Sequence, residues 1–183
     1  MAKGTYINGK WHTGDGDWFE KTSPATGETS WEGQAASAAQ VNDAVEAAQD
    51  AGREWRHVPQ DTRTRILEAY AGEIEKRTED ISKAISEDMG KARWESLAEA
   101  GAMKGKIQIS IDAQVERAGG RSHETAFGGS HLTHRPHGVM AVFGPFNFPG
   151  HLPNGHIVPA LLAGDTVIFK PSEETPLTGQ LMV

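Results

Sequence analysis

Polar side chains follow two short apolar segments near the end of the sequence. Asn147 lies in a loop after the apolar segment 138–144, and Lys170 and Glu173 follow the segment 166–169. An asparagine amide can donate a hydrogen bond to an oxyanion that forms on an attacked carbonyl. A lysine and a glutamate can together hydrogen-bond the two hydroxyls of a ribose. These residue types suggest a nucleotide site beside a reacting carbonyl.

Each of these residues also has a structural interpretation. Asn147 could cap the helix that follows it, and Lys170 and Glu173 could form a solvated ion pair. Spacing alone favours these structural roles. The fingerprint GxGxxG of standard dinucleotide sites is absent from the sequence. No Ser-His-Asp triad stands out, and Ser172 has no obvious base near it in the sequence.

The sequence does not favour a metal site. His131, His134 and His137 repeat every three residues. On a strand this spacing alternates between the two faces, so the three side chains cannot converge on one ion. The chain contains no cysteine. Disulfides, thiolate metal sites and a cysteine nucleophile are therefore excluded within these residues.

The apolar pattern around the polar residues predicts a βαβ unit. The segments 138–144 and 166–169 are typical of buried strands, and 154–162 is typical of a helix that Gly164 ends. Ligands of open parallel sheets bind beyond the carboxyl ends of the strands, so we expect both polar loops at one edge. A further helix is expected to begin at Thr175, with Pro176 at its first position. The chain stops at Val183 within that helix, and we expect a truncated domain.

The first 120 residues are predicted to contain short strands followed by helices. Turn signals at 8–9 and 24–28 separate strands within 5–33. Helices are expected from Ser37 to about residue 56, over 61–89 and over 94–117, with Gly90 as a cap. The helix 61–89 should carry an i,i+4 ion pair between Glu79 and Lys83. Its apolar stripe comprises Leu67, Tyr70, Ile74, Ile81 and Ile85.

A hairpin and an acidic composition complete the organisation. Residues 121–137 are expected to form a two-stranded hairpin around Gly128 and Gly129, which must rest on another surface. The net charge of −7 argues against a nucleic-acid binder. The longest apolar runs are shorter than the roughly 18 residues of a membrane span, and the N-terminus has no signal-peptide core, so a cytoplasmic location is expected.

Several motifs resemble the aldehyde dehydrogenase superfamily. They are YINGKW, SPATGE, PFNFP and PALLAGDTVIFKPSE, and they occur in the order that the family has. The phrases DMGKARWES and NFPGHLPNGHIVPALLAG resemble the branch that oxidises N-succinylglutamate 5-semialdehyde in arginine catabolism. The resemblance extends from about Tyr6 to Val183.

The resemblance implies an α/β fold with an open parallel sheet flanked by helices. Residues 1–120 would supply strands and helices of the NAD-binding domain, 121–137 an oligomerisation hairpin, and 138–183 the first βαβ unit. Asn147 would supply the oxyanion amide, and full-length subunits would form a homo-oligomer. The cofactor-binding residues that the resemblance implies are Lys170, Glu173, Ser172, Pro145, Phe146 and Phe143. Glu173 favours NAD, because a carboxylate would repel the 2′-phosphate of NADP.

The family mechanism needs groups that this chain lacks. A cysteine thiolate attacks the aldehyde, hydride passes to NAD, and a glutamate activates the water that hydrolyses the thioester. In the family, the cysteine and the glutamate belong to sequence after the position of Val183. We therefore expect an N-terminal fragment that is inactive alone. The alternative is a non-catalytic module that binds nucleotide or docks on other subunits.

Overall fold

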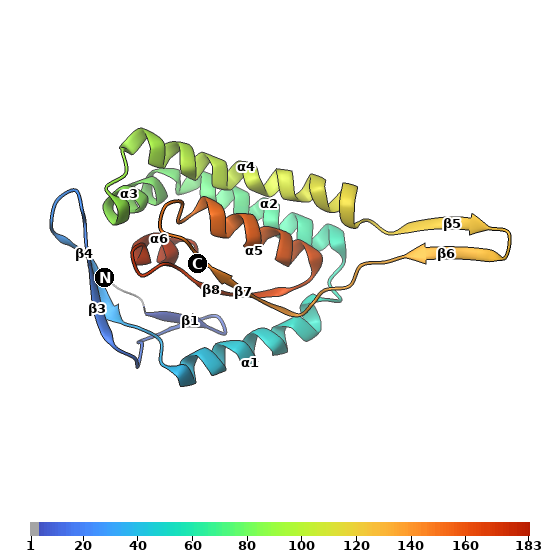
Figure 1. Cartoon of the computed structure of the whole chain (residues 1–183), viewed down its shortest axis with the longest axis horizontal. Coiled ribbons are helices and arrows are strands. Elements are labelled where there is room, and N and C mark those ends of the chain that lie inside the picture. Colours follow the sequence, from blue (N-terminus) through green and yellow to red (C-terminus); the bar gives the residue numbers. More distant parts are fainter. Residues whose placement is uncertain (1–3) are drawn as a thin grey trace.

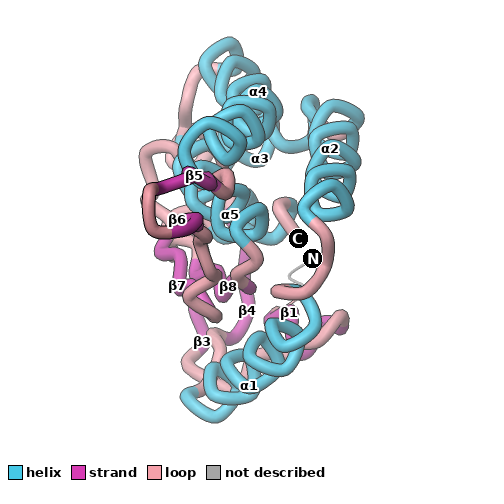
Figure 2. The backbone as a smooth tube through the Cα atoms, turned by 90° about the vertical axis from the view of Figure 1, so that its right-hand side faces the viewer, coloured by secondary structure: helices cyan, strands magenta, loops and turns pink. Residues whose placement is uncertain are grey.

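The computed structural model describes residues 4–183, with a layer of helices above small sheets and one helix below them (Figures 1 and 2). The helices are α1 (Ala38–Trp55), α2 (Gln60–Lys76), α3 (Thr78–Met89), α4 (Arg93–Ala118), α5 (His151–Ala163) and α6 (Pro176–Leu181). The strands are β1 (Thr5–Ile7), β2 (Lys10–His12), β3 (Trp18–Thr22), β4 (Thr29–Gln34), β5 (Arg121–Thr125), β6 (Gly128–Leu132), β7 (Val139–Phe143) and β8 (Thr166–Lys170).

The two N-terminal hairpins lie where the turn signals predict them. Strands β1 and β2 pair antiparallel through Ile7 and Lys10. Asn8 and Gly9 between them have φ of 49° and 77°, the left-handed conformations that a tight hairpin turn requires. Strands β3 and β4 pair antiparallel across the turn at 24–28, and the rings of Phe19 and Trp31 stack with centroids 4.6 Å apart. The predicted turns are thus confirmed.

Helix α1 begins with a complete capping box. The Oγ of Ser37 accepts a hydrogen bond from the backbone N–H of Gln40 at 3.2 Å, and the Oε1 of Gln40 accepts one from the N–H of Ser37 at 3.1 Å. This arrangement satisfies two amide groups that a helix start leaves without partners. The predicted bounds of this helix are confirmed.

The single helix predicted over 61–89 is wrong, because the chain breaks it at Arg77. Arg77 has φ −105° and ψ 13°, and α3 begins at the next residue. The Oγ1 of Thr78 donates to the carbonyls of Ile74 and Glu75 in the last turn of α2. The apolar stripe continues across the break because both helices pack on α4, so periodicity did not reveal it.

The expected ion pair between Glu79 and Lys83 does not form. Glu79 pairs with Arg93 at 2.5 Å, and Lys83 pairs with Glu87 at 3.7 Å. Residue Arg93 begins α4, so the tertiary arrangement offers Glu79 a nearer partner than its own helix does.

Helix α4 is the centre of the core. It contacts α2, α3 and α5, and its predicted extent and the Gly119 end are confirmed. Burying one large aliphatic side chain contributes roughly 1.5–3 kcal/mol, so this cluster stabilises the helical layer strongly. Its buried members are Leu67, Ile74, Ile81, Ile85, Ala100, Met103, Ile107, Val158 and Leu162.

The predicted βαβ unit is present. Strands β7 and β8 pair in parallel with Val139 opposite Thr166 and Phe143 opposite Lys170. Helix α5 connects them, begins three residues before the predicted start, continues through Pro159, and ends at Gly164 with φ 96°. Helices α1 and α5 both contact the two strands and lie on opposite sides of them in Figure 1. Strand β7 is less covered than predicted, because Val142 is its one buried residue.

The predicted hairpin projects away from the rest of the chain (Figure 1). Strands β5 and β6 pair antiparallel, and every residue in them is exposed. The turn lies at Ala126 and Phe127, so its predicted position at Gly128 and Gly129 is wrong. Among residues 4–183, no helix is both long and apolar enough to cross a membrane.

Two glycines with opposite backbone requirements test the helix assignments. Gly90 ends α3 at φ 66°, and an added Cβ would lie 3.1 Å from the Cγ of Pro24. Gly90→Ala should lower the free energy of unfolding by about 1–2 kcal/mol, because a left-handed alanine is strained. Gly72 lies inside α2 with open space around an added Cβ. Gly72→Ala should therefore raise the free energy of unfolding by about 0.5–1 kcal/mol, because glycine loses more conformational freedom than alanine in a helix. Urea unfolding measures both free energies. Changes of the same sign in the two variants would contradict the placement of Gly90 at a helix end and Gly72 inside a helix.

Candidate functional site

The two loops that carry the polar residues leave the same edge of the parallel sheet. Phe143 lies opposite Lys170 at the carboxyl ends of β7 and β8. The N–H of Gly144 donates to the carbonyl of Lys170 at 2.9 Å, so the strands stay paired up to the point where the loops begin. The loops 144–150 and 170–175 therefore lie together, as the sequence predicts.

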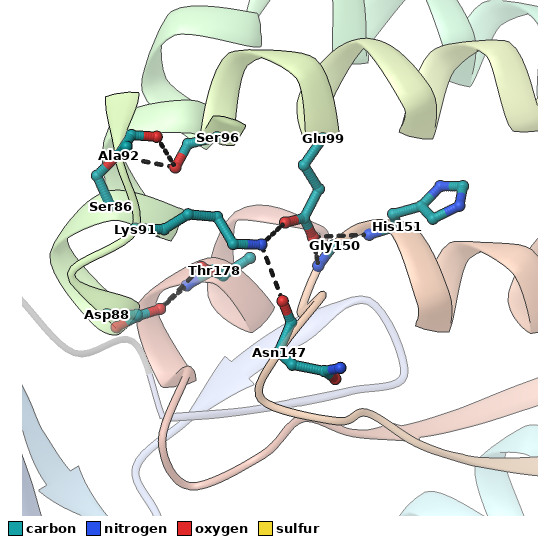
Figure 3. Close-up of polar contacts among 10 residues, drawn as sticks. All are labelled: Ser86, Asp88, Lys91, Ala92, Ser96, Glu99, Asn147, Gly150, His151 and Thr178. Atoms are coloured by element: carbon teal, nitrogen blue, oxygen red, sulfur yellow. Dashed lines mark hydrogen bonds and ion pairs between the residues drawn. The ribbon is translucent and has the colours of Figure 1, made fainter. Parts of the chain in front are cut away.

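Asn147 does not cap the following helix. The N-cap of α5 is Gly150, so the structural interpretation of Asn147 as a cap is wrong. The Asn147 side chain is exposed and makes no hydrogen bond to any of residues 4–183. Figure 3 shows it pointing away from the buried side of the loop, whereas its backbone carbonyl accepts a hydrogen bond from the Nζ of Lys91 at 2.8 Å. The amide is thus free to bind another group.

Lys170 and Glu173 form an ion pair at the same edge. The Nζ of Lys170 lies 2.6 Å from the Oε2 of Glu173, and their side chains are 58% and 70% exposed. The hydrogen bond from Lys170 lowers the pKa of Glu173, so its carboxyl is ionised at neutral pH. The solvated ion pair considered from the sequence is therefore present, and it remains open to a ligand.

The other predicted cofactor residues divide into two groups. Phe143 and Phe146 are exposed at the edge, and Pro145 between them is half-buried. Ser172 is instead buried, and its Oγ accepts a hydrogen bond from the N–H of Glu174 at 3.2 Å. The hydroxyl of Ser172 thus shapes its own loop.

Glu99 holds the first loop from the helical layer. Its side chain is fully buried in α4. The Oε1 of Glu99 accepts hydrogen bonds from the N–H groups of Gly150 at 3.0 Å and His151 at 3.2 Å. Its Oε2 lies 2.7 Å from the Nζ of Lys91 (Figure 3). A buried carboxylate thereby satisfies the amide groups at the start of α5.

Asp88 holds the second loop in a similar way. The Asp88 Oδ2 accepts hydrogen bonds from the N–H and the Oγ1 of Thr178, both at 2.8 Å (Figure 3). Thr175 stands before Pro176 as predicted, but its own hydroxyl has no partner among residues 4–183 and does not cap α6. Burial raises the pKa of Asp88 to about 6, and the hydrogen bonds from Thr178 oppose that rise.

Sequence reasoning missed both buried carboxylates. Glu99 stands four residues before Met103 and eight before Ile107, so it lies on the apolar stripe of its helix. Asp88 lies three residues after the buried Ile85. An acidic residue on a buried stripe is a signal that could have found them, because such a charge needs partners.

No metal site accompanies these residues. Within residues 4–183, no three His, Asp or Glu side chains gather closely enough to hold an ion. The Nδ1 of His131 lies 2.9 Å from the Oγ of Ser122 on the projecting hairpin. A surface hollow of about 360 Å³ lies between α2 and α4, and one of about 510 Å³ lies between the first hairpin and α1. Neither is lined by the loops that follow β7 and β8.

Comparison with known proteins matches this chain to one family. The pattern of the aldehyde dehydrogenase family matches residues 11–183. N-succinylglutamate 5-semialdehyde dehydrogenase 2 of Caulobacter vibrioides is 54% identical over all 183 residues, which cover 38% of that protein. The corresponding enzyme of Salmonella agona is 51% identical over 178 residues, with 97% of this chain and 36% of that protein covered.

Solved structures show the same likeness. The NADP-dependent glyceraldehyde-3-phosphate dehydrogenase of Bacillus halodurans, solved with NADP, has a TM-score of 0.89 and 30% identity, covering 96% of this chain and 38% of that one. The lactaldehyde dehydrogenase of Escherichia coli has a TM-score of 0.87 and 29% identity, covering 97% and 38%. The chain thus spans about 38% of the length of the proteins that it matches.

The protonation of Asp88 gives a testable pH dependence. Its pKa of about 6 in the folded chain exceeds the ordinary value of 3.8. Its contribution to stability is therefore fully present below pH 3.8 and is lost as pH rises through about 6. From pH 7 to pH 4, the free energy of unfolding should rise by about 2.4 kcal/mol relative to that of Asp88→Asn, because one pKa unit is about 1.4 kcal/mol and the unfolded-state carboxyl is partly protonated at pH 4.

Urea unfolding of the two proteins at several pH values measures this difference. The control is Asp80→Asn, because Asp80 is exposed on the same helix. The difference in free energy of unfolding between the unsubstituted protein and Asp80→Asn should show no comparable rise from pH 7 to pH 4. A constant difference for Asp88→Asn would contradict the raised pKa.

Proposed function

The chain belongs to the aldehyde dehydrogenase family, and we propose that it is the N-terminal part of an NAD-dependent enzyme that oxidises N-succinylglutamate 5-semialdehyde. The substrate is proposed because relatives with that name share about half of its residues along nearly its whole length. The observation that supports the proposed chemistry is that the loop of Asn147 and the Lys170–Glu173 pair follow neighbouring parallel strands at one sheet edge. The product would be N-succinylglutamate.

The edge has the chemistry that an NAD ribose needs. The two ribose hydroxyls can donate to the Glu173 carboxylate and accept from the Lys170 ammonium. Both side chains are more than half exposed and already adjacent, so a ribose can reach them without displacing buried groups. Phe143 and Phe146 offer apolar surface beside the pair. NAD, when bound, accepts the hydride from the substrate carbon.

Asn147 is proposed to bind the oxygen of the attacked aldehyde. Attack on the carbonyl carbon moves an electron pair to that oxygen, and an amide N–H can stabilise the resulting charge. The Asn147 side chain suits this role because it is exposed and is not committed to another hydrogen bond among residues 4–183. Its loop is also held from the buried side. The attacking thiolate and the glutamate base would come from other sequence, since the chain contains no cysteine.

A second candidate is a non-catalytic module that docks on other subunits. The projecting hairpin favours it, because every residue of β5 and β6 is exposed, and so is the apolar Phe127 at its tip. A two-stranded hairpin is only marginally stable alone, and a partner surface would support it. In the enzyme proposed above, the same hairpin would join identical subunits.

Activity measurements test the proposed enzyme. The 183-residue chain should form no NADH from NAD and N-succinylglutamate 5-semialdehyde, because it contains no cysteine to attack the aldehyde. A longer protein that contains this chain and a cysteine-bearing catalytic part should form NADH, measured by its absorbance. NADH formation by the short chain would contradict the assignment. A longer protein that oxidises other aldehydes but not this one would contradict the substrate.

The choice of cofactor is tested at Glu173. In the longer protein, Glu173→Gln should reduce the preference for NAD over NADP in kcat/KM by about tenfold, because the repulsion between the carboxylate and the 2′-phosphate of NADP is lost. Glu174→Gln is the matched control, since Glu174 pairs instead with Lys21 at 2.5 Å. An unchanged preference in Glu173→Gln would place the ribose elsewhere.

A further inference from the structure

We propose that Lys91 and Glu99 are positioning residues that aim the Asn147 amide, an inference that rests on the proposed function of Asn147. Neither residue faces the open edge. They bind the backbone at the Asn147 carbonyl and at the Gly150 and His151 amides. Figure 3 shows both residues on the side of the loop that faces α4.

The carboxylate of Glu99 is the fixed point of this arrangement. It projects from α4, a helix of 26 residues at the centre of the core. Its side chain has no exposed surface, and both of its oxygens have partners. One oxygen binds the amides of Gly150 and His151, and the other binds Lys91. A buried carboxylate with this number of donors has little freedom to move.

Lys91 connects the Glu99 carboxylate to the backbone of Asn147. Its side chain is 14% exposed, and its Nζ lies 2.7 Å from Glu99 and 2.8 Å from the carbonyl oxygen of Asn147. The same Nζ lies 4.1 Å from the centre of the Phe148 ring. An ammonium group has three N–H donors, so it can serve both oxygens and still face the ring.

The backbone after Asn147 is therefore held at two places, the Asn147 carbonyl and the amides at the start of α5. The Glu99 carboxylate binds the amides of Gly150 and His151 directly. It binds the Asn147 carbonyl indirectly, through Lys91. Gly150 is also confined, because a Cβ there would lie 2.4 Å from the Sδ of Met103. With its backbone carbonyl bound to Lys91, Asn147 directs its exposed side chain away from Lys91 and Glu99 (Figure 3).

Such fixing matters for an oxyanion donor more than for a ligand-binding loop. Catalytic groups must be held within about 0.5 Å of the productive position. A misplacement of about 1 Å can reduce the rate about 100-fold. Loss of Lys91 should therefore affect the chemical step through Asn147, whereas binding of NAD at Lys170 and Glu173 should be affected little.

A double-mutant cycle in the longer, active protein tests this role. Lys91→Met keeps an unbranched side chain that is one atom shorter, and it removes the charge and the N–H donors. It should lower kcat per active site by roughly 10- to 100-fold, with KM for NAD changed less than about twofold. Lys91→Arg should recover most of the loss because it keeps the charge and donors. In the Asn147→Ala background, Lys91→Met should reduce kcat little further.

The matched control is Lys104→Met. Lys104 lies on the same helix as Glu99, and its exposed ammonium pairs at 2.5 Å with Glu75 of α2 and not with the loop. It should leave kcat unchanged. The proposal would be overturned if Lys91→Met lowered kcat by the same factor in the unsubstituted protein and in Asn147→Ala. Equal factors would show that Lys91 does not act through Asn147.

Amide exchange separates failure of this inference from failure of the proposed function. In the 183-residue chain, Lys91→Met should accelerate exchange at Gly150 and His151, while Lys104→Met should not. Unchanged exchange would overturn the role of Lys91 in holding the loop, whatever the activity. Accelerated exchange with no NADH formation by the unsubstituted longer protein would overturn the proposed function, and with it the role of Asn147, but not the contact.

Discussion

The buried starts of two helices constrain this structure most. Helix α5 follows the loop of Asn147, and α6 follows the loop of Lys170 and Glu173. The first N–H groups of a helix have no partners within it, and burying them unsatisfied is costly. Here Glu99 supplies acceptors to the start of α5 and Asp88 to the start of α6. Both carboxylates come from the helical layer, so the core also fixes the two loops of the site.

This arrangement divides the chain into a rigid support and an open edge. Helix α4 packs on three other helices around a continuous apolar cluster, whereas the carboxyl edge of β7 and β8 exposes aromatic and charged side chains. The buried carboxylates of Glu99 and Asp88 each accept hydrogen bonds, which reduces the cost of removing them from water. The exposed side chains, by contrast, make few contacts within residues 4–183, so they remain available to a cofactor or another part of a protein.

Local sequence signals predicted most elements but not every boundary. The Asn8–Gly9 turn, the Ser37 cap and the Gly164 end each depend on neighbouring residues, and the structure confirms them. The break at Arg77 was missed because the apolar repeat continues through it. The hairpin turn was placed two residues too late because glycine content suggested it, whereas cross-strand pairing sets it.

The sequence by itself determined most of the order of strands and helices, the family resemblance, and the presence of polar residues after two parallel strands. These features depend on residue types at short spacing, which can be recognised from the sequence itself. Only the tertiary structure decided that Asn147 is not a helix cap, that Lys170 pairs with Glu173, and which carboxylates hold the loops. Glu99 and Gly150 are 51 residues apart, and such contacts arise from packing of whole helices, which no local pattern encodes.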